Sequence, residues 1–246
     1  MIRVHVQGAK GRMGSTVVSA VEAAADMELS GTSDLGDDLA AALAASSPDV
    51  AVEFTTPDAV EQSVKTMLEA GVHVVSGTTG MSCEQAQALG EVAAARELGF
   101  LLAPNFSIST ILLQRFAGAA ARHFADVEII ELHHERKLDA PSGTAIHTAR
   151  LIAEAAPDEV NPGRPDETET IPGCRGGKEA GIPIHSVRLP GLLAHQEVIF
   201  GAQGQLLTLR QDTLDREAFM PGVLLGIRKI REHRGLIDSL EHLLDD

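Results

Sequence analysis

The sequence contains no tryptophan and no tyrosine, and its aromatic content of 3% comes entirely from seven phenylalanines. Proteins that bind single-stranded nucleic acid stack bases on aromatic side chains, so this class of protein is disfavoured. Basic residues are fewer than acidic ones. The chain has 20 Lys and Arg and 35 Asp and Glu, which gives a net charge of −15. We therefore expect no general attraction to nucleic acid or to an anionic membrane surface.

Cysteines and long apolar runs are scarce as well. Cys83 and Cys174 have neither the spacing of a metal site nor the number of a disulfide framework, so we expect incidental thiols and no metal. No apolar run approaches the roughly 18 residues that span a bilayer, and the N-terminus lacks the pattern of a secretory signal. These features predict a cytoplasmic protein whose 246 residues form one large domain or two modest ones.

Short apolar runs alternate with amphipathic stretches from residue 1 to about residue 105. The predicted strands are Ile2–Gln7, Glu28–Thr32, Val50–Phe54, Val72–Ser76 and Phe100–Ala103. Between two of them, Val17, Ala20, Val21 and Ala24 recur at helical spacing. This alternation predicts an α/β domain with right-handed crossovers and a parallel sheet.

The pattern changes after Asn105. We expect a helix at 108–124, a strand at 127–133, a helix at 142–155 and then a Pro- and Gly-rich loop at 156–181 that serves as a lid. Three more strands (184–189, 195–200 and 205–211) and a helix (216–231) complete the predicted elements, with a hairpin turn at 201–204. Two domains are therefore expected.

The first predicted strand leads into the sequence GAKGRMG at residues 8–14, and a helix follows. Glycines at such a turn let the backbone approach a pyrophosphate, and the helix N-terminus favours an anion. Asp34 ends the second strand, 20 residues after Gly14, where an acidic side chain accepts hydrogen bonds from an adenosine ribose. We predict a dinucleotide site rather than a purely structural turn. Asp34 favours NADH, while Lys10 and Arg12 leave NADPH possible.

Two further turns follow predicted strands, at Gly77–Gly80 and at Ala103–Phe106. Ligands of parallel sheets bind beyond the carboxyl ends of the strands, so both turns are candidates for the same site. The alternative is that both are ordinary turns without a ligand.

The densest cluster of chemically active side chains is ELHHERKLDAPSGTA at residues 131–145. It places four potential cations within five residues at the end of a strand, and His133 and His134 face opposite ways if that strand continues. A helix that starts at Ser142 offers the N–H groups of Gly143 and Thr144 to a carboxylate.

This cluster predicts a local positive pocket for an anionic substrate within an acidic protein. A solvated basic loop, a metal-binding histidine pair and structural histidines are the alternatives. Zinc is disfavoured because no third ligand follows at a recognisable spacing.

Five segments together resemble the dihydrodipicolinate reductase family, also called 4-hydroxy-tetrahydrodipicolinate reductases. They are VHVQGAKGRMG, GVHVVSGTTG, APNFS, ELHHERKLDAPSGTA and GIPIHSVRLPG, and with the segments EFTTP and FMPG the resemblance covers nearly the whole chain. It implies an NAD(P)H-dependent oxidoreductase that reduces 4-hydroxy-tetrahydrodipicolinate to tetrahydrodipicolinate in the diaminopimelate route of lysine biosynthesis.

The resemblance also implies roles for individual residues. His133 would be the acid/base and Lys137 the proton donor, while His134, Gly143 and Thr144 would bind the substrate's carboxylates. The positions that would hold NADH or NADPH are Gly8, Ala9, Lys10, Gly11, Arg12, Met13, Asp34, Gly77, Thr78, Thr79, Ala103, Pro104, Asn105 and Phe106.

The same resemblance implies two domains and a homotetramer. Residues 1–106 and 215–246 would form a Rossmann-like dinucleotide-binding domain, and residues 107–214 an α+β domain with a mixed sheet for substrate binding and tetramerisation. Two other functions remain open from the residues alone: a non-catalytic redox sensor, and another NAD(P)-linked dehydrogenase acting on aspartate- or homoserine-type substrates. The sensor would need a recognition module, and the sequence shows no basic helix-turn-helix.

Overall fold

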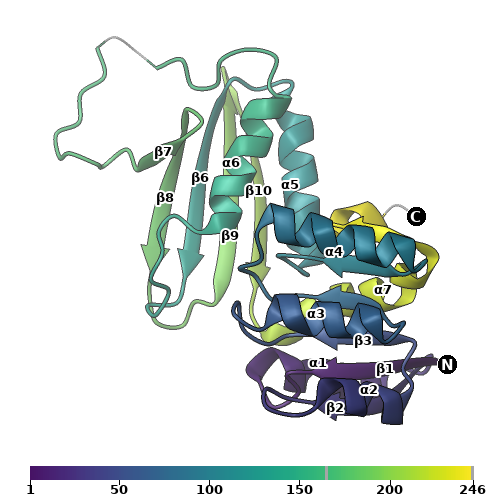
Figure 1. The fold of residues 1–246 in the computed structure, drawn as a ribbon. Coiled ribbons are helices and arrows are strands. Elements are labelled where there is room, and N and C mark those ends of the chain that lie inside the picture. The colour runs from purple at the N-terminus through teal and green to yellow at the C-terminus, as the bar shows by residue number, and fades with distance from the viewer. Residues whose placement is uncertain (164–165, 245–246) are drawn as a thin grey trace. The chain divides into compact units, whose positions relative to one another are not determined.

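The computed structural model describes residues 1–163 and 166–244 of the chain. Residues 164–165, within the predicted loop, and residues 245–246, at the end of the predicted first domain, lie outside this description. The chain divides into two compact units, Met1–Ser107 with Arg216–Asp246, and Ile108–Asp215. The first unit is therefore discontinuous in sequence, and the second is one continuous insertion (Figure 1).

The first unit contains a six-stranded sheet in the order β11-β5-β4-β3-β1-β2, in which every pair of neighbouring strands is parallel. Its strands are β1 (Ile2–Gln7), β2 (Met27–Ser33), β3 (Val50–Glu53), β4 (His73–Ser76), β5 (Gly99–Leu102) and β11 (Gly235–Ile237). The central strand β3 is buried along its whole length, because parallel sheets are covered on both faces. The predicted parallel α/β sheet is confirmed.

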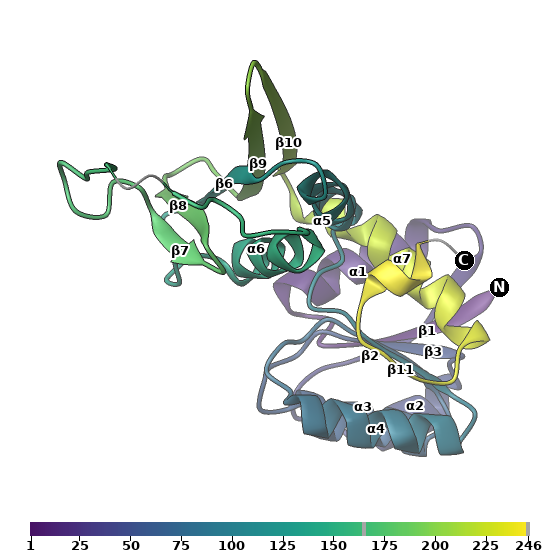
Figure 2. The ribbon, with the colours of Figure 1, turned by 90° about the horizontal axis from the view of Figure 1, so that it is seen from above.

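Helices cover both faces of this sheet. Figure 2 shows α2, α3 and α4 on one face and α1 and α7 on the other. Their bounds are α1 (Arg12–Ala23), α2 (Leu39–Ser46), α3 (Val60–Glu69), α4 (Cys83–Ala95) and α7 (Met220–Lys229). The apolar spacing that predicted α1 is the buried face of that helix, since Val17 and Val21 are fully buried.

The C-terminal segment differs from the single helix predicted at 216–231. It forms η1 (Arg216–Phe219), then α7, then η2 (Ile230–Glu232), and η3 (Leu240–Leu243) follows later. The α-helix begins at Met220 because Pro221 lacks a backbone N–H and fits only in a first turn. Sequence analysis missed β11, whose three residues are too few for a periodic pattern.

The second unit contains a five-stranded mixed sheet in the order β10-β9-β6-β8-β7. Only β6 and β8 are parallel neighbours. The elements are α5 (Ile108–Ala121), β6 (Asp126–His133), α6 (Gly143–Ala155), β7 (Gly177–Glu179), β8 (Ile182–Arg188), β9 (Ala194–Ala202) and β10 (Gln205–Thr213). Figure 2 shows α5 and α6 on the same face of this sheet. The predicted mixed sheet is confirmed.

Three local expectations for this unit need correction. The predicted loop at 156–181 contains the short strand β7, which pairs with β8. The hairpin between β9 and β10 is tighter than predicted, because Ala202 already pairs with Gln205. Strand β6 ends at His133, so the alternation expected to separate His133 from His134 does not extend to His134. None of the helices in the described ranges has the length and apolar composition of a membrane span.

Candidate functional site

The glycine-rich loop between β1 and α1 is shaped by close backbone contacts. Gly8 has φ +84°, and a Cβ atom there would lie 2.2 Å from the backbone oxygen of Phe54. A Cβ atom at Gly14 would lie 2.0 Å from the carbonyl oxygen of Gly8, so the first turn of α1 packs directly on the loop. Larger residues at these two positions would push the loop out of this shape.

Most N–H groups of the loop already have acceptors. Gly8 and Ala9 donate to the carbonyl oxygen of Ser33 at 2.8 and 3.2 Å, and Gly11 donates to Gly8 at 3.0 Å. The N–H groups of Arg12 and Met13 belong to the first turn of α1, where a helix supplies no acceptor of its own. An anion at this loop would therefore be bound by the start of α1 rather than by the loop's first residues.

Asp34 follows β2 directly and lies beside the same loop. Its carboxylate accepts hydrogen bonds from the backbone N–H of Lys10 at 3.1 and 3.3 Å, and Lys10 Nζ lies 3.5 Å away. The Asp34 N–H donates to Asp37 Oδ2 at 2.8 Å. An acidic and a basic side chain thus stand next to each other at the edge of the loop.

The turns after β3, β4 and β5 meet around Phe54. A Cβ atom at Gly77 would lie 2.1 Å from the Phe54 ring, and the rings of Phe54 and Phe106 have centroids 5.8 Å apart. The predicted turns Gly77–Gly80 and Ala103–Phe106 therefore lie side by side at the carboxyl edge of the sheet, where ligands of parallel sheets bind.

A buried carboxylate fixes these turns. Glu53, the last residue of β3, is fully buried. It accepts hydrogen bonds from the Thr55 N–H at 2.8 Å, Ser76 Oγ at 2.6 Å, Thr78 Oγ1 at 3.1 Å and the Thr55 hydroxyl. The Thr55 N–H also donates to Thr78 Oγ1 at 2.9 Å. Thr78 is thereby held in one orientation beside the predicted cofactor turns.

A cavity of about 210 Å³ opens beside these turns. Its lining residues are Thr78, Thr79, Gly80, Met81, Leu102, Pro104 and Asp238. Asp238 follows β11, so it reaches the cavity from the far end of the chain, and sequence analysis missed it. No local motif marks Asp238, because its place depends on the pairing of β11 with β5.

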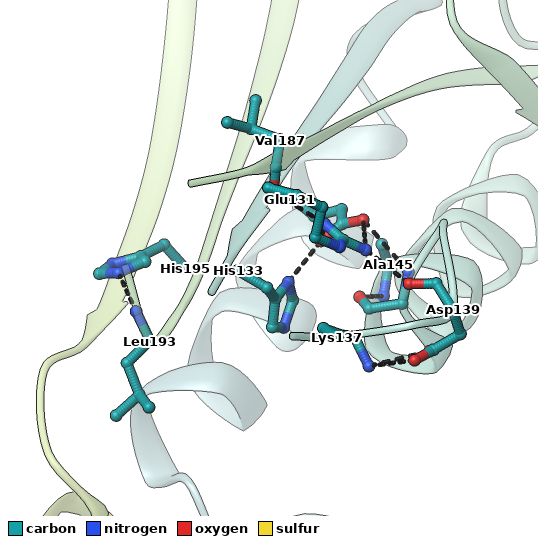
Figure 3. Close-up of polar contacts among 10 residues, drawn as sticks. Glu131, His133, Lys137, Asp139, Ala145, Val187, Leu193 and His195 are labelled. Atoms are coloured by element: carbon teal, nitrogen blue, oxygen red, sulfur yellow. Dashed lines mark hydrogen bonds and ion pairs between the residues drawn. The ribbon is translucent and has the colours of Figure 1, made fainter. Parts of the chain in front are cut away.

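In the second unit, His133 is the last residue of β6 and lies two residues after Glu131, on the same face of the strand. The two side chains are joined by a 2.5 Å contact between His133 Nδ1 and a Glu131 oxygen (Figure 3). His134 lies beyond the strand, and its Nδ1 accepts the N–H of Arg136 at 3.2 Å. The two histidines therefore have different surroundings.

Glu131 is the most strongly perturbed acid of this unit. Burial raises its pKa, but hydrogen bonds from His133, Arg188 and Ser186 outweigh burial and lower the pKa to about 2. The carboxylate is therefore ionised at neutral pH and only accepts hydrogen bonds, so His133 Nδ1 carries the hydrogen of their shared bond. The other ring nitrogen of His133, Nε2, takes no part in this bond.

Lys137 lies on the loop after β6 and faces Asp139. Its Nζ donates to both carboxylate oxygens of Asp139 at 2.8 Å (Figure 3). This hydrogen bond lowers the pKa of the Asp139 carboxyl. Leu138, which lies between Lys137 and Asp139 in the sequence, is 99% exposed. The ammonium group of Lys137 is thus held in place at the surface of the unit.

The helix α6 begins at Gly143, and Ser142 is its N-cap, whose hydroxyl accepts the N–H of Ala145 at 3.2 Å. A Cβ atom at Gly143 would meet nothing within 4 Å. Packing within the chain therefore does not require glycine at this position. The N–H groups of Gly143 and Thr144 lie in the first turn, which suits a carboxylate.

A third histidine, His195, has both ring nitrogens engaged, and Figure 3 shows its contact with Leu193. Leu193 N–H donates to its Nε2 at 3.2 Å, and its Nδ1 contacts Asp212 at 2.7 Å. Across residues 1–163 and 166–244, no group of three or more His, Cys, Asp or Glu side chains could hold a metal ion. A larger cavity of about 640 Å³ lies at the opposite end of β6, around Asp126 and Glu128, away from this chemistry.

Comparison with known proteins covers both units. The family models described as "Dihydrodipicolinate reductase, N-terminus" and "Dihydrodipicolinate reductase, C-terminus" match residues 2–106 and 109–244. Curated 4-hydroxy-tetrahydrodipicolinate reductases from Beutenbergia cavernae and Mycolicibacterium smegmatis are 51% and 50% identical, and each comparison covers 99% of both chains.

A solved structure agrees with these matches. It is the dipicolinate-bound dihydrodipicolinate reductase from Paenisporosarcina sp. TG-14, which is 42% identical, with a TM-score of 0.91 over 99% of this chain and 100% of the other. Each family model covers one part of the chain, and together they cover nearly all of it. The chain belongs to the dihydrodipicolinate reductase family.

Proposed function

We propose that this chain reduces 4-hydroxy-tetrahydrodipicolinate to tetrahydrodipicolinate with a reduced nicotinamide dinucleotide and one proton, the substrate's hydroxyl group being lost as water, in the diaminopimelate route of lysine biosynthesis. The observation that carries this function is that about half of the residues are identical, over nearly the full length, to those of curated 4-hydroxy-tetrahydrodipicolinate reductases. The charged cluster on β6 and α6 agrees with it, because a dicarboxylate needs cations and helix N–H groups in a protein of net charge −15.

We assign cofactor binding to the predicted domain 1–106 and 215–246. Its residues fit a dinucleotide. Gly8 packs against the backbone of Phe54 and Gly14 against the backbone of Gly8, so neither residue places a side chain in front of the loop. The start of α1 has no side-chain cap that would compete with a phosphate for its N–H groups. Arg12 and Met13 would supply N–H groups to the pyrophosphate. Asp34 would accept hydrogen bonds from the ribose, which slightly favours NADH, while the adjacent Lys10 would tolerate the extra phosphate of NADPH.

We assign the nicotinamide end of the cofactor to the turns Gly77–Thr79 and Ala103–Phe106. They lie together at the carboxyl edge of β4 and β5 and border the cavity of about 210 Å³. When bound there, the reduced nicotinamide supplies the hydride. The hydrogen bonds of Glu53 hold Thr78 in a fixed orientation for that contact.

We assign substrate binding to the predicted domain 107–214. The first turn of α6 would bind one carboxylate through the N–H groups of Gly143 and Thr144, and the open space at Gly143 leaves room for it. His134 would bind the substrate's carboxylates as well, from the loop after β6. The Paenisporosarcina relative, which is bound to dipicolinate, supports a small dicarboxylate as the ligand class.

Proton transfer falls to His133 and Lys137. Lys137 holds an ammonium proton beside Asp139 and is the donor to the substrate atom that receives the electron pair. His133 acts as acid/base through Nε2, because Nδ1 is engaged by Glu131. The chain's own contribution is thus orientation of the dicarboxylate and delivery of one proton.

A coupled assay tests the reaction. Aspartate semialdehyde, pyruvate and the upstream synthase generate the unstable substrate, and NADH oxidation is followed by absorbance. We expect NADH loss only when enzyme, synthase and both precursors are present. NADH loss that does not depend on the synthase, or no loss at all, would contradict the function. Parallel assays with NADPH measure the cofactor preference.

We also propose a homotetramer and a cytoplasmic location. The sheet of the second unit has α5 and α6 on the same face (Figure 2), and its other face carries half-buried apolar side chains such as Ile130 and Ile199, which suit a contact with a second copy. Light scattering coupled to size exclusion measures the mass, and a monomer at micromolar concentration would contradict the tetramer.

A further inference from the structure

The two proton-handling side chains of the proposed reaction are linked by residues that sequence analysis did not single out. Arg188 is the last residue of β8, and the parallel register of β6 and β8 makes it the direct partner of His133. It lies 57 residues from Glu131 in sequence, yet it binds that carboxylate with both Nη atoms. The distances are 3.0 Å to Oε2 and 2.8 Å to Oε1, the two-bond geometry that arginine forms with carboxylates.

The same guanidinium also reaches the lysine loop. Nη2 donates to the carbonyl oxygen of Asp139 at 2.7 Å, and Nη1 donates to the carbonyl oxygen of Val187 at 2.8 Å. Both Nη groups therefore use both of their hydrogens. Asp139 in turn holds Lys137 Nζ through its carboxylate. Arg188 thus fixes the backbone of the residue that positions the proposed proton donor.

Glu131 completes the connection on its other side. It holds His133 Nδ1 at 2.5 Å, and Oε1 accepts the backbone N–H of Ser142 at 3.3 Å. Ser142 caps α6, whose first turn is the proposed carboxylate site. The Glu131 side chain is completely buried and that of Arg188 is 18% exposed, so bulk water competes little for these bonds.

We propose that Glu131 and Arg188 are a positioning pair, which holds His133, the Lys137 loop and the start of α6 in one geometry for proton transfer. This inference rests on the proposed function. Neither residue is assigned contact with substrate or cofactor. The pair acts because one ionised carboxylate and one planar guanidinium between them make hydrogen bonds to all three elements. Lysine at position 188 could not reproduce this, since it offers a single point charge.

Three variants test the pair in the full-length enzyme: Arg188→Ala, Arg188→Lys and Glu131→Gln. The matched control is Arg150→Ala, which removes an exposed arginine of α6 whose ion pair among the described residues is with Glu179 near the surface. We expect each test variant to lower kcat by about 10- to 100-fold, as displacements of catalytic groups by about 1 Å do. The dissociation constant for NADH, measured by fluorescence, should stay within about twofold because the cofactor loop belongs to the other unit.

Chemical rescue by guanidinium ion separates positioning from a merely structural role, because added guanidinium would not raise kcat if Arg188 only stabilised the fold. Millimolar guanidinium chloride, far below denaturing concentrations, should restore kcat of Arg188→Ala several-fold, with sodium chloride at equal ionic strength as the control. It should not restore a Lys137→Ala variant or change Arg150→Ala. Restoration by sodium chloride alone, or none by guanidinium, would overturn the proposal, as would a kcat of the folded test variants within twofold of the wild type.

Circular dichroism establishes which variants fold before they are assayed. If Arg188→Ala does not fold, Arg188→Lys and Glu131→Gln decide, because both keep the volume of the buried side chain nearly unchanged. Loss of kcat with unchanged NADH binding supports the pair, and unchanged kcat overturns it. A wild type without substrate-dependent NADH loss would instead contradict the proposed function, so the two failures are distinguishable.

Discussion

Each unit buries one glutamate near the carboxyl end of a strand, and the two carboxylates have different partners. Among the residues that the structure describes, Glu53 accepts hydrogen bonds from neutral groups alone, the N–H and hydroxyl of Thr55 and the hydroxyls of Ser76 and Thr78. No ion pair of Glu53 occurs in the described part of the chain. Glu131 is held instead by a guanidinium, an imidazole and the N–H of Ser142, the N-cap residue of α6.

This difference follows the ligand that each unit is proposed to bind. The edge around Glu53 consists of glycine turns and hydroxyls, which shape the backbone for a dinucleotide without adding charge. The site around Glu131 consists of charged side chains, which a dicarboxylate requires. Substitutions of the glycines around Glu53 should therefore act through sterics, and substitutions of the charged side chains around Glu131 through charge and orientation.

The largest effect is expected at the residues that are proposed to transfer the proton. Lys137→Ala and His133→Ala should each lower kcat by about 10²- to 10⁴-fold, the usual contribution of general acid–base catalysis. NADH affinity should stay within about twofold, because neither residue lies in the first unit. Steady-state assays and fluorescence titration measure the two quantities. Equal losses of turnover and of NADH binding would mean that the cluster is structural.

The second prediction concerns the stability of the charged site. Glu131→Gln removes the carboxylate of a buried pair, and we expect about 2–3 kcal/mol lower free energy of unfolding at neutral pH, below the range for fully buried pairs because Arg188 is partly exposed. The pKa of Glu131 is about 2 in the folded protein, below its ordinary value of 4.5. Its stabilisation is therefore present above pH 4.5 and is lost as the pH falls toward 2.

Urea unfolding at several pH values tests this expectation. The difference between wild type and Glu131→Gln should be constant from pH 5 to 7 and should shrink between about pH 4.5 and 2. A difference that does not change over that range would show that the folded protein does not hold Glu131 as a stabilised carboxylate.

The third prediction tests the steric character of the cofactor edge. Gly14→Ala should destabilise the protein by about 1–3 kcal/mol, because the new Cβ atom would lie 2.0 Å from the Gly8 carbonyl oxygen. The control is Gly118→Ala in α5, where the nearest atom is 3.9 Å away and the helix should gain about 0.5–1 kcal/mol. Urea unfolding gives both values. A Gly14→Ala variant as stable as its control would refute tight packing of α1 on the loop.

The geometry of the glycine-rich loop was easier to predict from the sequence than the contacts of the charged cluster, for a physical reason. Gly8 and Asp34 directly follow β1 and β2, which are neighbours in the sheet, and Gly14 lies in the helix between these strands, so a short motif describes all three. Arg188 and Asp238 reach their sites only through the pairing of β8 with β6 and of β11 with β5. Strand pairing between distant segments leaves no mark in a local pattern, so both residues were missed.

The fourth prediction compares a second glycine with Gly14. Gly143 has open space around it, so Gly143→Ala should leave the free energy of unfolding unchanged within about 0.5 kcal/mol. The new methyl group would occupy the space where a substrate carboxylate is proposed to approach the first turn of α6, and we expect the apparent KM to rise about tenfold. An unchanged KM together with unchanged stability would remove Gly143 from the substrate site.

The smallest effect is expected at the pair of Lys10 and Asp34, where two charged side chains lie beside the glycine-rich loop of the first unit. Lys10 is 83% exposed at its side chain, so its ion pair contributes little stability. Lys10→Ala should therefore leave unfolding and kcat/KM for NADH unchanged within about twofold. It should lower kcat/KM for NADPH about three- to tenfold, since an exposed charge contributes about 1 kcal/mol to phosphate binding. Equal changes for both cofactors would place the 2′-phosphate away from Lys10 and leave Asp34 and Arg12 as the candidate determinants of preference in this loop.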